Sequence, residues 1–60
     1  MSEVVIETRL GYFQEVSDNH CVIDVPKEMA TPYPDPAAAR EVVRKFRLDE
    51  RDLVAGLDRR

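Results

Sequence analysis

The chain has 60 residues, a net charge of −3 and a single cysteine, Cys21. This length allows one domain, residues 1–60, whose core is expected to supply only about 3–5 kcal/mol of stability. A lone cysteine excludes an internal disulfide, and one Cys with one His (His20) is too few for the four ligands of a structural zinc site. We therefore expect no metal and no cofactor, and stabilisation by association as a homo-oligomer or with another protein.

The sequence contains no apolar run of the roughly 20 residues that a membrane span requires. Its start lacks the basic and then apolar pattern of a signal peptide. Because free cysteine is typical of reducing compartments, the predicted location is the cytoplasm, with no membrane contact.

Charge changes sign along the chain. Residues 1–39 carry seven acidic and two basic side chains, whereas residues 40–60 carry seven basic and five acidic ones. The change falls next to residues 26–36, which include four prolines. The basic half is the part of the chain that most resembles a binding surface.

The first predicted element is a strand over residues 3–10, where Val4, Ile6 and Leu10 alternate with charged residues. Gly11 follows, as a tight turn or as a bulge, and the sequence leaves both open. The polar edge of this strand, residues 3–9, is expected to be uncovered and available for self-pairing.

The next predicted element is a β-hairpin around Asp18 and Asn19, two residues that tolerate the backbone of a type I′ turn. The partners expected across it are Val16 with Cys21, Gln14 with Ile23 and Tyr12 with Val25. The apolar face expected from this register comprises Tyr12, Val16, Cys21, Ile23 and Val25.

The four prolines of residues 26–36 predict a stiff connector. It ends in a helix-start signal, because Asp35 can cap a helix that has Pro36 at its first position. The predicted first helix spans residues 36–47, and its apolar stripe is formed by Ala39, Val42, Val43 and Phe46.

A second helix is predicted over residues 50–58, with Asp49 as its N-cap and Leu53, Val54 and Leu57 on its apolar side. One bent helix over residues 36–58 is the alternative. The predicted fold class is therefore α+β: a three-stranded antiparallel sheet over residues 3–25, a proline-rich connector and two short C-terminal helices.

The candidate partner-binding residues are four arginines and one tyrosine. Arg40, Arg44, Arg47 and Arg51 follow the spacing i, i+4, i+7 and i+11, which on an uninterrupted helix forms one basic stripe. The stripe predicts a surface for an acidic protein. The alternative is a solvated face, in which Glu41 pairs with Arg44 or Lys45, and Glu50 pairs with Arg47. Arg40 has no acidic residue three or four positions away on its helix, so it has no partner there.

Tyr33 lies in the segment 31–36, where three of six residues are proline. An extended proline-rich segment can dock in the groove of a recognition domain, with Tyr33 as a contact. The alternative role is internal, with Tyr33 covering the sheet and the prolines aiming the first helix.

Nucleic-acid binding is disfavoured, since residues 49–52 would place acidic side chains where a helix-turn-helix meets phosphates. Residues 22–29 resemble the strand-Pro-Lys-Glu corner of swapped-hairpin antitoxins and transition-state regulators. The Gly-Arg pair expected before that strand and the Leu-Gly turn after it are missing, so we do not assign that family. The resemblance counts toward a dimeric DNA-binding regulator or antitoxin as the alternative function.

Catalysis is not predicted, because no nucleophile and base, glycine loop or carboxylate pair is arranged for it. The predicted function is a small cytoplasmic protein–protein interaction module. It would act as an accessory subunit, inhibitor or antitoxin-like regulator in an oligomer.

Overall fold

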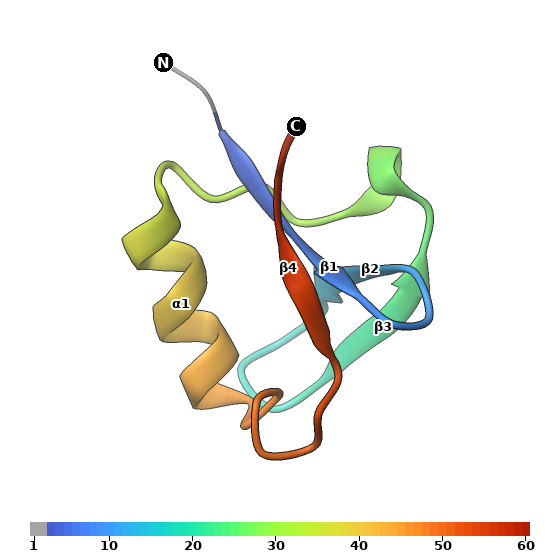
Figure 1. Ribbon diagram of the computed structural model, residues 1–60, viewed down its shortest axis with the longest axis vertical. Coiled ribbons are helices and arrows are strands. Elements are labelled where there is room, and N and C mark those ends of the chain that lie inside the picture. Colours follow the sequence, from blue (N-terminus) through green and yellow to red (C-terminus); the bar gives the residue numbers. More distant parts are fainter. Residues whose placement is uncertain (1–2) are drawn as a thin grey trace.

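The computed structural model describes residues 3–60, in which one α-helix packs beside a four-stranded antiparallel sheet (Figure 1). The strands lie in the order β3-β2-β1-β4. The elements are β1 Val4–Thr8, β2 Tyr12–Glu15, β3 Cys21–Val25, the 3-10 helix η1 Lys27–Met29, α1 Pro36–Lys45 and β4 Val54–Arg59. The prediction of three strands and two C-terminal helices is wrong, because a fourth strand stands where the helix over 50–58 was expected.

Helix α1 begins as its sequence predicts. The Asp35 carboxylate accepts a hydrogen bond from the Ala38 N–H at 2.8 Å, and Pro36 occupies the first helical position. The predicted apolar stripe is confirmed, since Ala39 and Val43 are buried and Val42 and Phe46 pack against the same core. The stripe fixes which side of α1 faces the sheet and leaves its basic side chains outside.

The helix ends earlier than predicted, in a Schellman motif that contains no glycine. Arg47 adopts a left-handed backbone with φ of 56°, and its N–H donates to the Arg44 carbonyl at 3.2 Å. The Leu48 N–H donates to the Val43 carbonyl at 3.0 Å, and the Leu48 side chain is fully buried. Burial of this leucine thus accompanies the turn of the chain away from the helix axis.

The same geometry recurs five residues further on. Asp52 also has φ of 56°, its N–H donates to Asp49 at 3.1 Å, and the Leu53 N–H donates to Leu48 at 3.1 Å. The chain therefore makes one helical turn and then enters β4. Asp49 starts no helix, and a bent helix over 36–58 is equally wrong.

Strand β1 is internal, which overturns the expectation that residues 3–9 form an open edge. It pairs with β4 from Val4 opposite Arg59 to Thr8 opposite Val54, and with β2 at Glu7 opposite Tyr12. The edge strands are β3 and β4. Gly11 closes the β1–β2 turn, where its carbonyl accepts from the Thr8 N–H at 2.8 Å.

The β2–β3 hairpin has a different register from the predicted one. Only Tyr12 opposite Val25 is confirmed, since the other pairs are Gln14 with Val22 and Glu15 with Cys21. The register shifts between Tyr12 and Gln14, and such a bulge moves side chains to the opposite face.

The shift changes which side chains form the core. Phe13, which is not part of the predicted apolar face, is fully buried and packs edge-to-face on Phe46 with ring centroids 5.5 Å apart. Val16, expected in the core, is 61% exposed. The turn is also not type I′, because neither Asp18 nor Asn19 has a positive φ.

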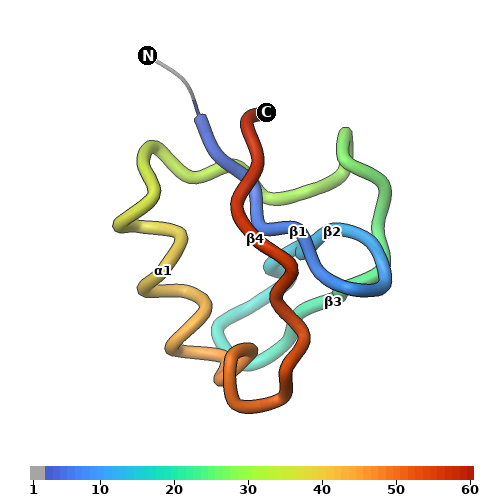
Figure 2. Tube along the Cα trace, viewed as in Figure 1, coloured from blue at the N-terminus to red at the C-terminus, as the bar shows by residue number. Residues whose placement is uncertain are grey.

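The proline-rich connector runs from the β3 side of the molecule to α1 (Figure 2) and supplies hydrogen bonds to the sheet. Tyr33 exchanges two backbone hydrogen bonds with Val4 of β1, at 2.8 and 2.9 Å. Thr31 donates its N–H to the Phe13 carbonyl at 3.1 Å and accepts from the Glu15 N–H at 2.7 Å through its hydroxyl. The connector therefore satisfies backbone groups of both β1 and β2.

The core lies between α1 and the sheet. Its buried members are Val4, Ile6, Phe13, Tyr33, Ala39, Val43 and Leu48.

Candidate functional site

Three of the predicted arginines border one groove at the C-terminal end of α1. Arg40 and Arg44 are one helical turn apart and exposed, and Arg47 is the left-handed residue just past the helix. The groove has a volume of about 240 Å³ and is lined by Arg40, Val43, Arg44, Arg47, Asp49 and Glu50. Helix period brings Arg40 and Arg44 together, and the Schellman turn adds Arg47.

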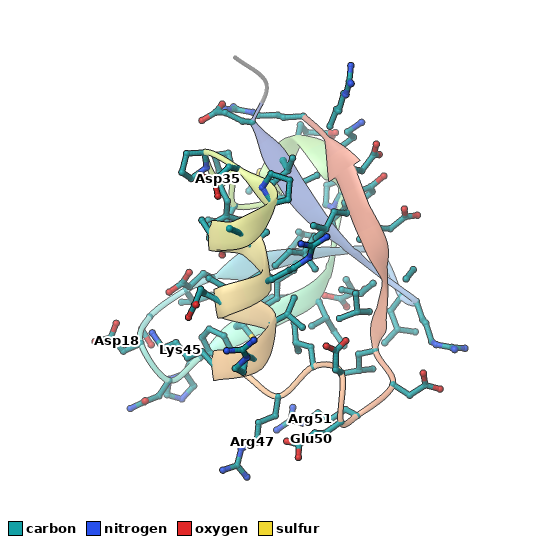
Figure 3. All side chains as sticks on the ribbon, turned by 60° about the vertical axis from the view of Figure 1, so that its left-hand side comes forward. Asp18, Asp35, Lys45, Arg47, Glu50 and Arg51 are labelled. Carbon is teal, nitrogen blue, oxygen red and sulfur yellow. The ribbon has the colours of Figure 1, made fainter. Side chains whose placement is uncertain are left out.

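Arg51 does not belong to this group. It lies in the loop after the helix, near Glu50 in Figure 3, and does not line the groove. Its positive charge acts on Cys21, where burial raises the pKa of the thiol and Arg51 opposes that rise. The four-arginine stripe required an uninterrupted helix, and α1 ends at Lys45.

Ion pairing distinguishes the groove arginines. Within residues 3–60, Arg40 and Arg44 have no carboxylate within 4.0 Å, whereas Arg47 Nε lies 3.7 Å from Glu50 Oε2. The Arg47–Glu50 pair is the one expected from the sequence. Both of these side chains are more than two-thirds exposed, so the pair contributes little to stability.

Lys45 pairs with a different partner from the expected Glu41. Its Nζ lies 3.7 Å from Asp18 and 3.9 Å from Glu15, which ties the end of α1 to the β2–β3 hairpin (Figure 3). Lys45 also lies over the Phe46 ring, at 5.5 Å from its centroid. Lys45 is thus engaged within the fold, which leaves Arg40 and Arg44 as the helix cations free of ion pairs in the described chain.

Two acidic residues of the groove were missed at the sequence level. The sequence predicts that Asp49 and Glu50 begin a second helix. Instead, the left-handed backbone at Arg47 and at Asp52 turns the chain so that both acidic residues line the groove with Arg47. No sequence signal marks these turns, because neither has the usual glycine. The groove therefore has three cations, two anions and an apolar residue, Val43, that is 5% exposed.

Tyr33 is placed in the interior role that the sequence left as an alternative. It is 8% exposed, and its hydroxyl donates to Glu15 Oε1 at 2.9 Å. Burial, reinforced by this hydrogen bond, raises the pKa of the phenol well above its ordinary value. A side chain held in this way offers little surface to a partner.

A second polar cluster lies on β2, β4 and η1. Asp58 Oδ2 accepts from the Tyr12 hydroxyl at 3.2 Å and lies 3.1 Å from Lys27 Nζ. The hydrogen bond from Lys27 is the main cause that lowers the pKa of Asp58. Since Asp58 stands opposite the buried Val5, this cluster is on the sheet face away from the groove.

The described part of the chain, residues 3–60, brings together no group of three or more His, Cys, Asp or Glu that could hold a metal. Over the same residues, α1 is too short and too polar to cross a membrane. The chemistry that the groove offers is recognition of charge by exposed guanidinium groups.

Comparison of the chain with protein-family models, with curated proteins and with solved structures finds no match. The case for a function therefore rests on the groove and its charges.

Proposed function

We propose that this protein is a small interaction module that binds an acidic surface of another protein through α1. In that role it acts as an accessory subunit, an inhibitor or an antitoxin-like regulator, in the cytoplasm and within an oligomer. The observation that carries the proposal is that Arg40 and Arg44 are exposed on one helix face with no ion pair inside the described chain. Guanidinium groups bind carboxylates with paired, planar hydrogen bonds, so two adjacent free arginines favour an acidic partner.

The direct test reverses the two charges. The doubly substituted protein Arg40→Glu, Arg44→Glu keeps the buried side of α1, and we expect it to remain folded but to lose its partner. The measurement is affinity capture from extracts of the source cells by the tagged full chain, followed by identification of partners that are lost on charge reversal. Circular dichroism verifies the fold.

The matched control is Arg51→Glu, Arg59→Glu, which changes net charge by the same amount at exposed positions that lie outside the groove and form no ion pair within residues 3–60. It should retain the partner. A partner that stays bound to the Arg40, Arg44 variant, or is lost equally from the control, rules out the α1 surface as the binding site.

The second candidate function is a dimeric DNA-binding regulator that uses the same helix face. Its support is the basic pair on α1; against it stand Asp49 and Glu50, which border the groove and repel phosphate. The candidate fails if fluorescence anisotropy detects no binding to duplex DNA at low ionic strength, where electrostatic association is strongest.

The proposed oligomer is tested by light scattering on the purified chain. A molar mass equal to that of the monomer at all concentrations would refute it.

A further inference from the structure

The groove beside α1 changes charge along its length. Arg40 and Arg44 stand on the helix, and Asp49 and Glu50 lie beyond its C-terminal end. The aligned peptide dipoles of α1 leave partial negative charge at its C-terminal end, which adds to the acidic character of that end. Val43 lies at the base of the groove, but it is only 5% exposed, so the groove offers a ligand mainly charged side chains.

This arrangement discriminates between acidic ligands. A uniformly anionic segment that gains contact with Arg40 and Arg44 meets Asp49 and Glu50 with the same sign of charge. A segment with carboxylates at one end and a cation at the other binds more tightly. Its carboxylates meet Arg40 and Arg44, and its cation meets the acidic end of the groove in place of a repelled carboxylate. Arg40 and Arg44 are separated by about 6 Å along the helix axis, which matches about two extended residues.

We infer that the groove binds a protein segment of mixed charge, in which carboxylates and a cation follow one another over a few residues. The carboxylates pair with Arg40 and Arg44, and the cation lies near Asp49, the groove carboxylate that has no ion pair within residues 3–60, since Glu50 is paired with Arg47. This inference rests on the proposed function and specifies the chemistry of its partner.

The test uses two synthetic peptides that differ only at one end. The first carries two glutamates, a leucine and two lysines in that order, and in the second peptide the lysines are replaced by glutamates. Binding is followed by NMR titration of the isotope-labelled full chain. We expect the mixed peptide to bind roughly three- to tenfold more tightly, since exposed charge pairs each contribute modestly, and to shift resonances of residues 40–50.

The decisive variant is Asp49→Asn, Glu50→Gln, which removes both negative charges and keeps the side-chain shapes. The Asp49 backbone carbonyl that holds the turn is unaffected. We expect this variant to lose the preference for the mixed peptide and to bind the all-acidic peptide more tightly than the unmodified protein does. An unchanged preference in the variant, equal binding of the two peptides by the unmodified protein, or no binding of either peptide overturns the inference.

The Arg40→Glu, Arg44→Glu variant separates this inference from the proposed function. If the unmodified protein binds both peptides equally and the variant binds neither, the mixed-charge ligand is refuted. The proposal of an acidic partner for Arg40 and Arg44 then still stands. Retention of both peptides in that variant refutes the role of the α1 arginines altogether.

Discussion

At the scale of single residues, Gly11 and Gly56 form a natural pair for comparison. Their φ angles are nearly equal, 158° and 157°, so a side chain meets the same backbone strain at both. A Cβ at Gly11 would lie 2.9 Å from the Asp24 Cα, whereas a Cβ at Gly56 has no atom within 4 Å. The close approach of the β1–β2 turn to β3 therefore depends on the missing side chain at Gly11.

We expect Gly11→Ala to lower the free energy of unfolding by about 1–3 kcal/mol more than Gly56→Ala. Only the methyl group at position 11 would push the β1–β2 turn away from the backbone of Asp24. Urea denaturation of both variants measures the difference. Equal losses would mean that strain in φ, and not the contact with Asp24, makes glycine necessary.

Arg47 is the residue at which the helix stops. A left-handed backbone costs roughly 1–2 kcal/mol for a residue with a side chain and almost nothing for glycine, although glycine also gains freedom in the unfolded chain. We expect Arg47→Gly to raise the free energy of unfolding by about 0.5–1 kcal/mol.

The control for this substitution is Arg44→Gly, three residues earlier inside α1. There the same change should lower the free energy of unfolding by about 1 kcal/mol. Thermal unfolding followed by circular dichroism compares the two variants, and destabilisation of both would argue against the Schellman end at Arg47.

At the scale of elements, the proline-rich connector acts as part of the sheet. Thr31 forms two hydrogen bonds with β2, one donated by its N–H and one accepted by its hydroxyl. Tyr33 forms two backbone hydrogen bonds with β1. A buried N–H without a partner costs about 1–3 kcal/mol, so the hydroxyl of Thr31 matters more than its methyl group.

We therefore expect Thr31→Val to lower the free energy of unfolding by about 1–3 kcal/mol, since the Glu15 N–H loses its acceptor. Thr31→Ser keeps the hydroxyl and should lose less. Amide hydrogen exchange at Glu15 gives a local readout: exchange that is as slow in Thr31→Val as in the unmodified chain would refute this role.

Elements that depend on local signals could be predicted from the sequence. The Asp35 cap, Pro36 and the stripe of Ala39 and Val43 act within a few residues of one another, and α1 begins and faces the core as they indicate. β4 could not be predicted, because residues 50–58 carry helix-favouring charges and become a strand through pairing with β1, about 50 residues away in sequence.

Part of the candidate site could also be predicted from local signals, and part of it could not. Helix period is enough to place Arg40 and Arg44 together, and the expected pairing of Arg47 with Glu50 is local. The acidic side of the groove depends on two left-handed residues, Arg47 and Asp52, that carry no glycine signal. The hairpin register failed for a related reason, since the bulge near Phe13 accompanies a hydrogen bond from the distant Thr31.

At the scale of the whole molecule, Asp58 links three segments of the sheet and connector. Lys27 and Tyr12 stabilise its charged form, which holds the pKa of Asp58 below the ordinary value of 3.8. A carboxyl whose pKa is lower in the folded state contributes stability that is present above its unfolded pKa and lost as pH falls through the folded value.

We expect the stability of the chain to decrease as pH is lowered below about 4, and Asp58→Asn to make that decrease smaller. The measurement is urea denaturation at a series of pH values from neutral to acid. The control is Asp24→Asn, an exposed position with no ion pair within residues 3–60, and it should leave the slope unchanged. An identical slope in Asp58→Asn would show that the Asp58 cluster is not linked to folding.

The position of β1 between β2 and β4 has a consequence for how the chain folds. Val4 and Ile6 leave the ribosome early, but the strand that pairs with them, up to Leu57 and Arg59, leaves it about 50 residues later. Until then β1 has one bare edge that is rich in apolar residues, and closing it requires contacts of long sequence separation, which form slowly. We therefore expect the docking of β4 to be a late step of folding, and the edge of β1 to favour aggregation until β4 has docked.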